Sequence, residues 1–197
     1  MKVFTPFPKI ARLNREITIT EKLDGTNAQI CIEPGIKDAP MSIYSWFDEA
    51  TQTDMVMYAG SRTRWITPEQ DNQGFARWAK ENAQELTKLG EGSHFGEWWG
   101  QGIQRKYNLT TKRFSLFNVA RWNSETLPTC CNVVPTLYVG TFSEEQIKAQ
   151  LTKLATDGSV AAPGFPQPEG IVIWHEASRT LYKVTILGDE KPKGQTE

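Results

Sequence analysis

The stretch that decides the fold is Glu21-Lys22-Leu23-Asp24-Gly25-Thr26-Asn27. It links residues 16–23 to residues 27–33 and shares residues with both segments. Each segment alternates apolar with polar side chains, the pattern of a half-buried β-strand. A hairpin is the simplest connection, because Asp-Gly is a common turn dipeptide. The sequence therefore predicts two strands flanking Asp24-Gly25-Thr26, with Lys22 held on rigid backbone at the end of the first strand.

Outward from this stretch, candidate strands outnumber candidate helices. Further strands are expected at residues 42–46, 55–59, 95–99, 114–120, 137–140, 170–175 and 180–186. One helix is expected to begin near Glu69 and to stop at Gly90, and a second to follow the capping box Ser143-Glu144-Glu145-Gln146. Because strands and helices do not alternate regularly, the pattern predicts an α+β fold with antiparallel sheets.

Composition narrows the class of protein. A chain of 197 residues and 22.3 kDa is long enough for one domain, and a net charge of -1 excludes a uniformly basic nucleic-acid coat but not one basic groove. The three cysteines, two of them adjacent at Cys130 and Cys131, make neither a disulfide framework nor a zinc spacing. We therefore expect a reducing, cytoplasmic location, and no apolar run approaches the roughly 18 residues of a membrane-spanning helix.

Lys22 is the first candidate for chemistry. A lysine amine is a nucleophile only when neutral, and nearby cations or desolvation lower its reference pKa of about 10.4. A solvated lysine beside a hairpin turn explains the same residues.

Two further segments also leave alternatives open. Arg62 and Arg64 suit phosphate contacts or a solvated strand end, and Glu97 suits ribose hydroxyls or an internal arginine.

Three later residues complete the set. Phe117 offers a flat face for stacking a base, although an aromatic residue in a strand is more often core. Glu169 precedes a fully apolar strand and Lys183 lies within another, so the two could neutralise each other across a hairpin.

Each segment is weak alone, but their order is informative. Along the chain they are Glu21–Asn27, Ser61-Arg62-Thr63, Phe95-Gly96-Glu97, Phe117, Glu169-Gly170 and Lys183. This ordered set resembles the covalent nucleotidyltransferase superfamily of ATP-dependent polynucleotide ligases and mRNA capping enzymes. Within it, residues 16–187 are similar to the RNA ligase branch that seals nicks in duplex RNA. The resemblance implies the ATP-grasp-like ligase adenylation fold, an α+β domain of two antiparallel sheets flanked by helices.

The resemblance also implies an activity. Lys22 would attack the α-phosphate of ATP to form lysyl-AMP, the AMP would pass to an RNA 5′-phosphate, and a 3′-hydroxyl would displace it. Lys183 would neutralise the α-phosphate, and Glu169 would act near the metal or phosphate. Nucleotide-contacting residues would be Glu21, Asn27, Arg62, Glu97 and Phe117.

The expected cofactors are ATP and Mg²⁺, or Mn²⁺ in its place, and the sequence assigns no protein ligand to the metal. The expected partners are RNA ends, in a nicked duplex or a single strand, with no membrane; oligomeric state is unreadable. We expect residues 1–197 to form one nucleotidyltransferase domain without an appended C-terminal nucleic-acid-binding domain. Grip on RNA would then come from the domain itself. Residues 101–112, which include Arg105 and Tyr107, are the candidate phosphate-contact surface, with a solvated charged loop as the alternative.

Two alternative functions remain. One is a DNA ligase or a capping-type nucleotidyltransferase. The other is a non-catalytic nucleotide- or RNA-end-binding module of the same fold. The second is motivated by Asn118, where the branch usually has Asp, and by Lys183 standing without the second lysine of a Lys-x-Lys pattern.

Overall fold

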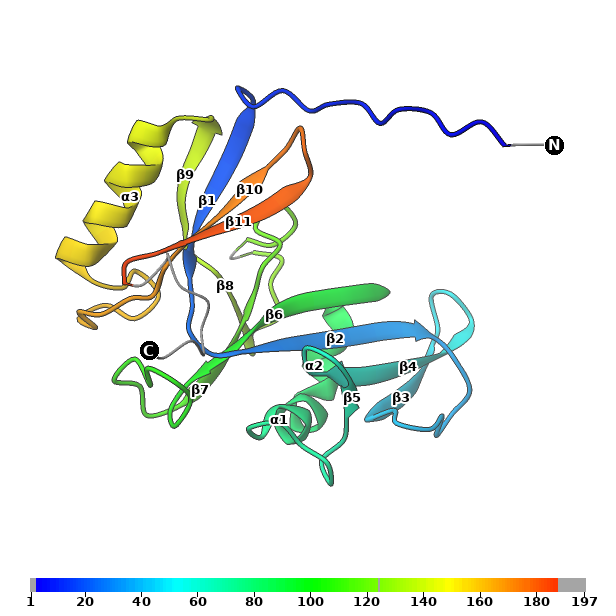
Figure 1. Ribbon diagram of the computed structural model, residues 1–197. Helices are drawn as coiled ribbons and strands as arrows, with labels where there is room; N and C mark the ends of the chain where they lie inside the picture. Colours follow the sequence, from blue (N-terminus) through cyan, green and yellow to red (C-terminus); the bar gives the residue numbers. More distant parts are fainter. Residues whose placement is uncertain (1–2, 124, 188–197) are drawn as a thin grey trace, which may run out of the picture. The chain divides into compact units, whose positions relative to one another are not determined.

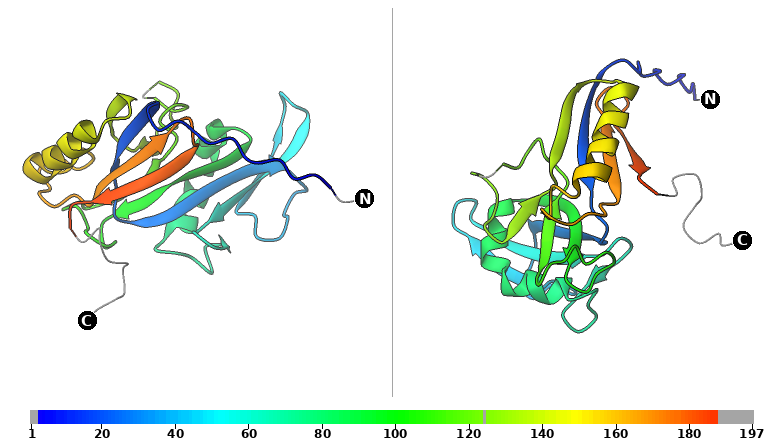
Figure 2. Two further views of the ribbon diagram at one scale, coloured as in Figure 1. Left: turned by 45° about the horizontal axis from the view of Figure 1, so that its top comes forward. Right: turned by 90° about the vertical axis from the view of Figure 1, so that its left-hand side faces the viewer.

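The computed structural model describes residues 3–123 and 125–187 of the chain. The chain divides into two compact units, the first formed by Met1–Lys22 with Pro135–Glu197 and the second by Leu23–Val134. Figures 1 and 2 show the helices and strands of both units. The single domain expected from the sequence therefore stays a prediction.

The first unit is a four-stranded antiparallel sheet with one helix. Its strand order is β11-β10-β1-β9. The elements are β1 (Glu16–Lys22), β9 (Thr136–Thr141), α3 (Glu144–Asp157), β10 (Gly170–His175) and β11 (Thr180–Thr185). Helix α3 packs on one face of this sheet (Figure 1). The core between them is built from Ile17 and Ile19 of β1, Ile171 and Ile173 of β10, and Leu154 of α3.

Helix α3 begins at the capping box as its sequence predicts. The hydroxyl of Ser143 accepts a hydrogen bond from the backbone N–H of Gln146 at 3.3 Å, which satisfies one of the donors that a helix start leaves free. The helix ends at Gly158, whose φ of 88° is a left-handed value that glycine adopts without strain.

The second unit is a seven-stranded sheet with short helices on one face. Its strand order is β3-β4-β2-β6-β7-β8, with β5 paired to β4. The strands are β2 (Thr26–Pro34), β3 (Tyr44–Asp48), β4 (Thr53–Gly60), β5 (Trp65–Ile66), β6 (Gly92–Gly100), β7 (Lys112–Leu116) and β8 (Cys131–Val133). The helices are α1 (Phe75–Glu81), α2 (Ala83–Leu86) and the 3-10 turn η1 (Thr87–Leu89). Phe75, Leu86, Trp98 and Phe114 belong to the core.

The expected α+β class with two sheets is confirmed, with two differences. The pair β7 and β8 is parallel rather than antiparallel. The hairpin expected around Asp24-Gly25 is wrong, because β1 and β2 belong to different sheets. β10 spans the predicted residues, whereas β5 and β8 are too short to leave a periodic signal.

The predicted single helix from Glu69 to Leu89 is shorter and interrupted. Left-handed backbone at Gln73 (φ 55°) and Gly74 (φ 82°) prevents the helix from starting before Phe75. The side chain of Asp71 then accepts hydrogen bonds from the first turn, at 2.8 Å from the N–H of Ala76 and 3.1 Å from that of Arg77. Apolar periodicity identifies the buried face of a helix but does not detect these left-handed residues.

Within residues 3–123 and 125–187, no helix is long and apolar enough to cross a membrane.

The cap at Asp71 gives the first prediction. Replacing Asp71 with alanine removes an acceptor from three backbone donors, those of Asn72, Ala76 and Arg77, and should lower the free energy of unfolding by about 1–2 kcal/mol. Urea denaturation followed by circular dichroism measures the change. The exposed Glu49→Ala should change stability by less than about 0.5 kcal/mol. Equal effects of the two substitutions would contradict the capping role.

Candidate functional site

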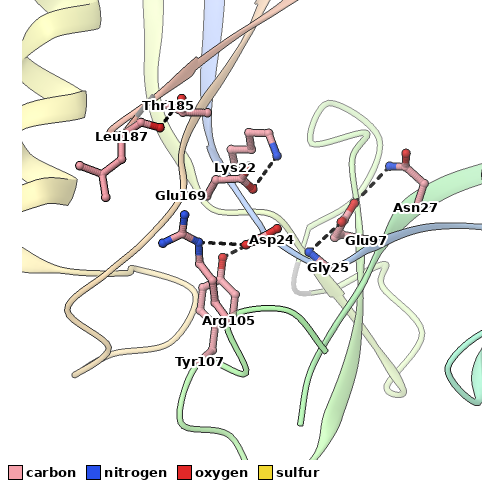
Figure 3. Close-up of polar contacts among 10 residues, drawn as sticks. All are labelled: Lys22, Asp24, Gly25, Asn27, Glu97, Arg105, Tyr107, Glu169, Thr185 and Leu187. Atoms are coloured by element: carbon pink, nitrogen blue, oxygen red, sulfur yellow. Dashed lines mark hydrogen bonds and ion pairs between the residues drawn. The ribbon is translucent and has the colours of Figure 1, made fainter. Parts of the chain in front are cut away.

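The first unit holds Lys22 in an ion pair. Lys22 is the last residue of β1, and its amine lies 2.6 Å from Oε2 of Glu169, which directly precedes β10 (Figure 3). The Glu169 side chain is 3% exposed and that of Lys22 is 21% exposed. A carboxylate this buried requires a partner, and Lys22 supplies one. The amine at the same time keeps some access to solvent.

Strand register places Lys183 on the same sheet face as Lys22. Thr20 lies opposite Val172, and Val172 opposite Lys183. Residues opposite each other in an antiparallel sheet share a face, and so do residues two apart on one strand, which puts Lys22 with Thr20. Standard strand geometry separates the two lysine Cα atoms by about 12 Å, a span that two extended lysine side chains can bridge to one anion. This face is the one opposite the core with α3.

Glu21 lies on the other face, despite being the neighbour of Lys22. Its carboxylate accepts hydrogen bonds from the Ser159 hydroxyl at 2.6 Å and from the backbone N–H groups of Val160 and Ala161, both at 2.9 Å. Burial raises the pKa of this carboxyl, and the three hydrogen bonds oppose that rise. The Glu21 side chain thus anchors a loop, and its backbone N–H donates to the carbonyl of Pro135 at 2.9 Å.

The second unit builds a pair around Glu97. This residue of β6 lies opposite Asn27 of β2. Its carboxylate accepts from the backbone N–H of Gly25 at 2.9 Å and from the Asn27 side-chain amide at 3.2 Å (Figure 3). These two contacts fix the orientation of the Glu97 carboxylate.

Gly25 is required by this arrangement. A Cβ at this position would collide with the carbonyl oxygen of Trp98 and would lie 2.7 Å from Cβ of Trp99. Only glycine lets the backbone come this close to β6 and donate to Glu97. The Asp-Gly pair therefore serves close packing rather than a hairpin.

Asp24 is fixed by residues that the sequence suggested for another role. Its backbone N–H donates to the Tyr107 hydroxyl at 2.8 Å, and its carboxylate pairs with Nε of Arg105 at 3.0 Å (Figure 3). Tyr107 is 1% exposed and packs edge-on against Trp99. Arg105 and Tyr107, which the sequence suggested as part of a phosphate-contact surface, thus bind the Asp24 turn with these polar groups, and the phosphate-contact role stays a prediction. A basic and aromatic loop composition does not distinguish the two uses.

Phe117 lies just beyond β7 and is exposed, at 41%. Its backbone N–H donates to the carbonyl of Phe95 at 3.0 Å, which continues the pairing of β7 with β6. The core alternative for Phe117 is therefore wrong. The neighbouring Asn118 accepts from the backbone N–H of Arg121 at 3.1 Å through its side-chain oxygen. An Asp would offer the same acceptor, so the departure at Asn118 leaves this turn intact.

Arg62 lies on the exposed turn between β4 and β5. In that turn the backbone N–H of Ser61 donates to the carbonyl of Arg64 at 2.8 Å.

The predicted site residues lie in two sets, one in each unit. Lys22, Glu169 and Lys183 belong to the first unit, and Asn27, Glu97 and Phe117 share one face of the second unit's sheet. Glu21 points away from its set, and Arg62 lies at the sheet edge.

No group of three or more His, Cys, Asp or Glu side chains that could hold a metal ion occurs among the described residues. A cage made by the protein alone is thus not present in that part of the chain.

The comparison with protein families is decisive for identity. A family model described as RNA ligase matches residues 15–185. The chain belongs to the RNA ligase family. The match covers both sets of candidate residues, from Lys22 to Lys183. A search of curated proteins gave no match.

Solved structures show the same fold. A lysine mutant of the Naegleria gruberi RNA ligase with ATP and Mn aligns with a TM-score of 0.57 and 18% identity, covering 88% of this chain and 50% of that one. An arginine mutant of the same ligase with ATP and Mn aligns with a TM-score of 0.56 and 19% identity, over 88% and 50% of the two chains. This member of the RNA ligase family spans about half the length of those solved chains. The expected nucleotidyltransferase fold is confirmed by this likeness.

The raised pKa of Glu21 gives a second prediction. Its folded-state pKa lies above the ordinary 4.5, so the folded protein binds more protons than the unfolded chain just above pH 4.5. Stability from this group is therefore complete below pH 4.5 and is lost as pH rises through the folded-state pKa. Glu21→Gln does not titrate. The unfolding free energy of wild type minus that of Glu21→Gln should therefore fall from pH 4.5 to neutrality.

Urea denaturation across this pH range measures the difference. Glu16→Gln, which alters an exposed carboxylate on the same strand, serves as control. A wild-type advantage over Glu21→Gln that grows with pH would contradict the assignment.

Proposed function

We propose that this chain is an ATP-dependent RNA ligase that works through a lysyl-AMP intermediate. The observation that carries the proposal is the pairing of Lys22 with the buried Glu169, on the sheet face that also bears Lys183. Membership of the RNA ligase family and the ATP and Mn of the Naegleria gruberi ligase structures support the same assignment.

In the first step the neutral amine of Lys22 attacks the α-phosphorus of ATP. A P–N bond forms, the P–O bond to pyrophosphate breaks, and pyrophosphate leaves with the bonding electron pair. The amine must lose protons to become neutral and to complete the bond. Glu169 Oε2, 2.6 Å from the amine, is within hydrogen-bond reach to accept one.

Lys183 supplies positive charge on the same face. When the triphosphate binds, the ammonium group of Lys183 would lie close to the α-phosphate. There it would stabilise the negative charge that develops on the α-phosphate in the transition state. Positioning and charge neutralisation are the main contributions a protein makes to such a displacement.

Residues of the second unit suit the nucleoside. The Glu97 carboxylate, oriented by Gly25 and Asn27, is assigned to the ribose hydroxyls, because a carboxylate oxygen accepts hydrogen bonds from hydroxyl donors. The exposed ring of Phe117 offers a stacking surface for adenine. Asn27 and Arg62 are assigned to the ribose and phosphate region or to the RNA end, and Glu21 contributes through its backbone.

The residues fit a divalent cation that arrives with the triphosphate. Mg²⁺ or Mn²⁺ is commonly held by substrate phosphates, several waters and one or two carboxylates, and Glu169 is the carboxylate proposed here. The cation would neutralise charge on the phosphates.

The later steps join RNA. An oxygen of an RNA 5′-phosphate attacks the phosphorus of lysyl-AMP, the P–N bond breaks, and a phosphoanhydride to AMP forms. A 3′-hydroxyl then attacks the 5′-phosphate, loses its proton and expels AMP.

A substitution at Lys22 separates chemistry from folding. Lys22→Ala would remove the ammonium group that pairs with the buried Glu169, a loss that is expected to cost about 3–5 kcal/mol of stability. Lys22→Arg keeps a positive charge beside Glu169, but a guanidinium stays protonated and cannot attack phosphorus. With α-labelled ATP and Mg²⁺, wild type should acquire a label that survives denaturation and is acid-labile, and folded Lys22→Arg should acquire none.

Lys153→Ala, which alters an exposed lysine on α3, should label like wild type. Label on Lys22→Arg, or none on wild type, would contradict the proposal. ATP binding without any adduct would favour the non-catalytic module, and competition between RNA and DNA ends would separate an RNA ligase from a DNA ligase.

Phe117 gives a prediction for ATP binding. Removing the ring in Phe117→Ala should raise the ATP concentration for half-maximal labelling roughly tenfold or more, because base stacking on an aromatic ring contributes about 1–3 kcal/mol. Phe47→Ala removes another exposed ring of the same unit and should change it little. An unchanged ATP requirement in Phe117→Ala would place adenine elsewhere.

A further inference from the structure

A row of residues crosses the seven-stranded sheet on the face opposite its core. Trp65 of β5 lies opposite Gly60 of β4, Gly60 opposite Gln29 of β2, and Gln29 opposite Phe95 of β6. Phe117 continues the row through its bond to the Phe95 carbonyl. Since opposite residues share a face, Trp65, Gln29, Phe95 and Phe117 all point to this side.

The rings in this row are exposed. Trp65 is 40% exposed, Phe95 is 55% and Phe117 is 41%, whereas residues on the other face, such as Ile30, are fully buried in the core. The three large rings are thus aligned along one row of this sheet face, with Gly60 and Gln29 between Trp65 and Phe95. With standard strand spacing, the row extends about 19 Å from Trp65 to Phe117, which is longer than one nucleobase.

Trp65 is held flat against the sheet. A Cβ built on Gly60 would lie 3.1 Å from Cζ3 and 3.2 Å from Cε3 of its indole, so the ring rests on the Gly60 backbone. The ring of Tyr58 supports it as well, with 5.4 Å between the ring centroids. One side of the indole is thus backed by the protein, and a pre-oriented ring loses little freedom when it binds.

Positive charge lies directly beside this ring. Arg62 and Arg64 are exposed on the turn that leads from Gly60 into Trp65. The turn is closed by the Ser61 N–H and hydroxyl, which both donate to the Arg64 carbonyl, at 2.8 Å and 3.2 Å. Guanidinium groups next to a stacking ring are the combination that binds the backbone and bases of a single strand.

We propose that Trp65 and Phe95 stack unpaired bases of the RNA substrate, with Arg62 and Arg64 at its phosphates. This inference rests on the proposed function, in which Phe117 takes the adenine of ATP. Bases within a duplex have both faces covered by neighbours, whereas unpaired bases can stack on side chains. The row therefore assigns an RNA end with single-stranded nucleotides beside the join as the substrate, rather than a nick in continuous duplex.

Fluorescence anisotropy with a labelled single-stranded RNA, without ATP, tests the proposal on the full chain. Trp65→Ala should weaken binding roughly tenfold or more, Trp65→Phe should keep most of it, and Gly60→Ala should weaken it by tilting the indole. Binding of a fully paired duplex of the same sequence should be equal in wild type and Trp65→Ala. Phe47→Ala should bind both RNAs like wild type.

Lysine adenylylation is measured on the same preparations, together with circular dichroism to verify folding. Wild type that forms no adduct would count against the proposed function. Normal adduct formation with single-strand binding unchanged in Trp65→Ala would overturn only the present inference. So would an equal loss for single strand and duplex, or an equal loss in Phe47→Ala.

Discussion

The ion pair between Lys22 and the buried carboxylate of Glu169 constrains how β1 and β10 align in the first unit. A carboxylate with 3% exposure is costly without a cation, and the amine at 2.6 Å provides it. The pair forms because β1 and β10 align in one register, from Ile17 opposite His175 to Lys22 opposite Gly170. A slip by one residue would turn Lys22 to the core face and Glu21 to the open face.

Alternation along β1 explains why two neighbouring residues have different roles. Ile17, Ile19 and Glu21 face α3, and the carboxylate that this places in the interior is satisfied by the loop at Ser159. Lys22 faces the other way, with Thr20. A single strand thus supplies a structural anchor and a candidate nucleophile, separated by one peptide bond.

In the second unit, close packing of the backbone around Gly25 fixes the position of the Glu97 carboxylate. Gly25 approaches β6 so closely that its N–H reaches Glu97, and Asp24 beside it is bound by Tyr107 and Arg105. None of these three contacts is visible in the sequence, because the residues that they join lie 72 to 83 positions apart in the chain. The same sheet presents Glu97 and Phe117 on its open face through register alone.

The sequence by itself determined the class of fold, most strands, the capped start of α3 at Ser143, and the order of chemical residues from Lys22 to Lys183. These follow from short-range periodicity, turn chemistry and motif spacing, which are local properties of a chain. Only the tertiary structure decided that β1 and β2 join different sheets, that the helix begins at Phe75, and that Glu169 pairs with Lys22. Those outcomes depend on strand register and on left-handed or closely packed backbone, and such interactions link residues far apart in the chain.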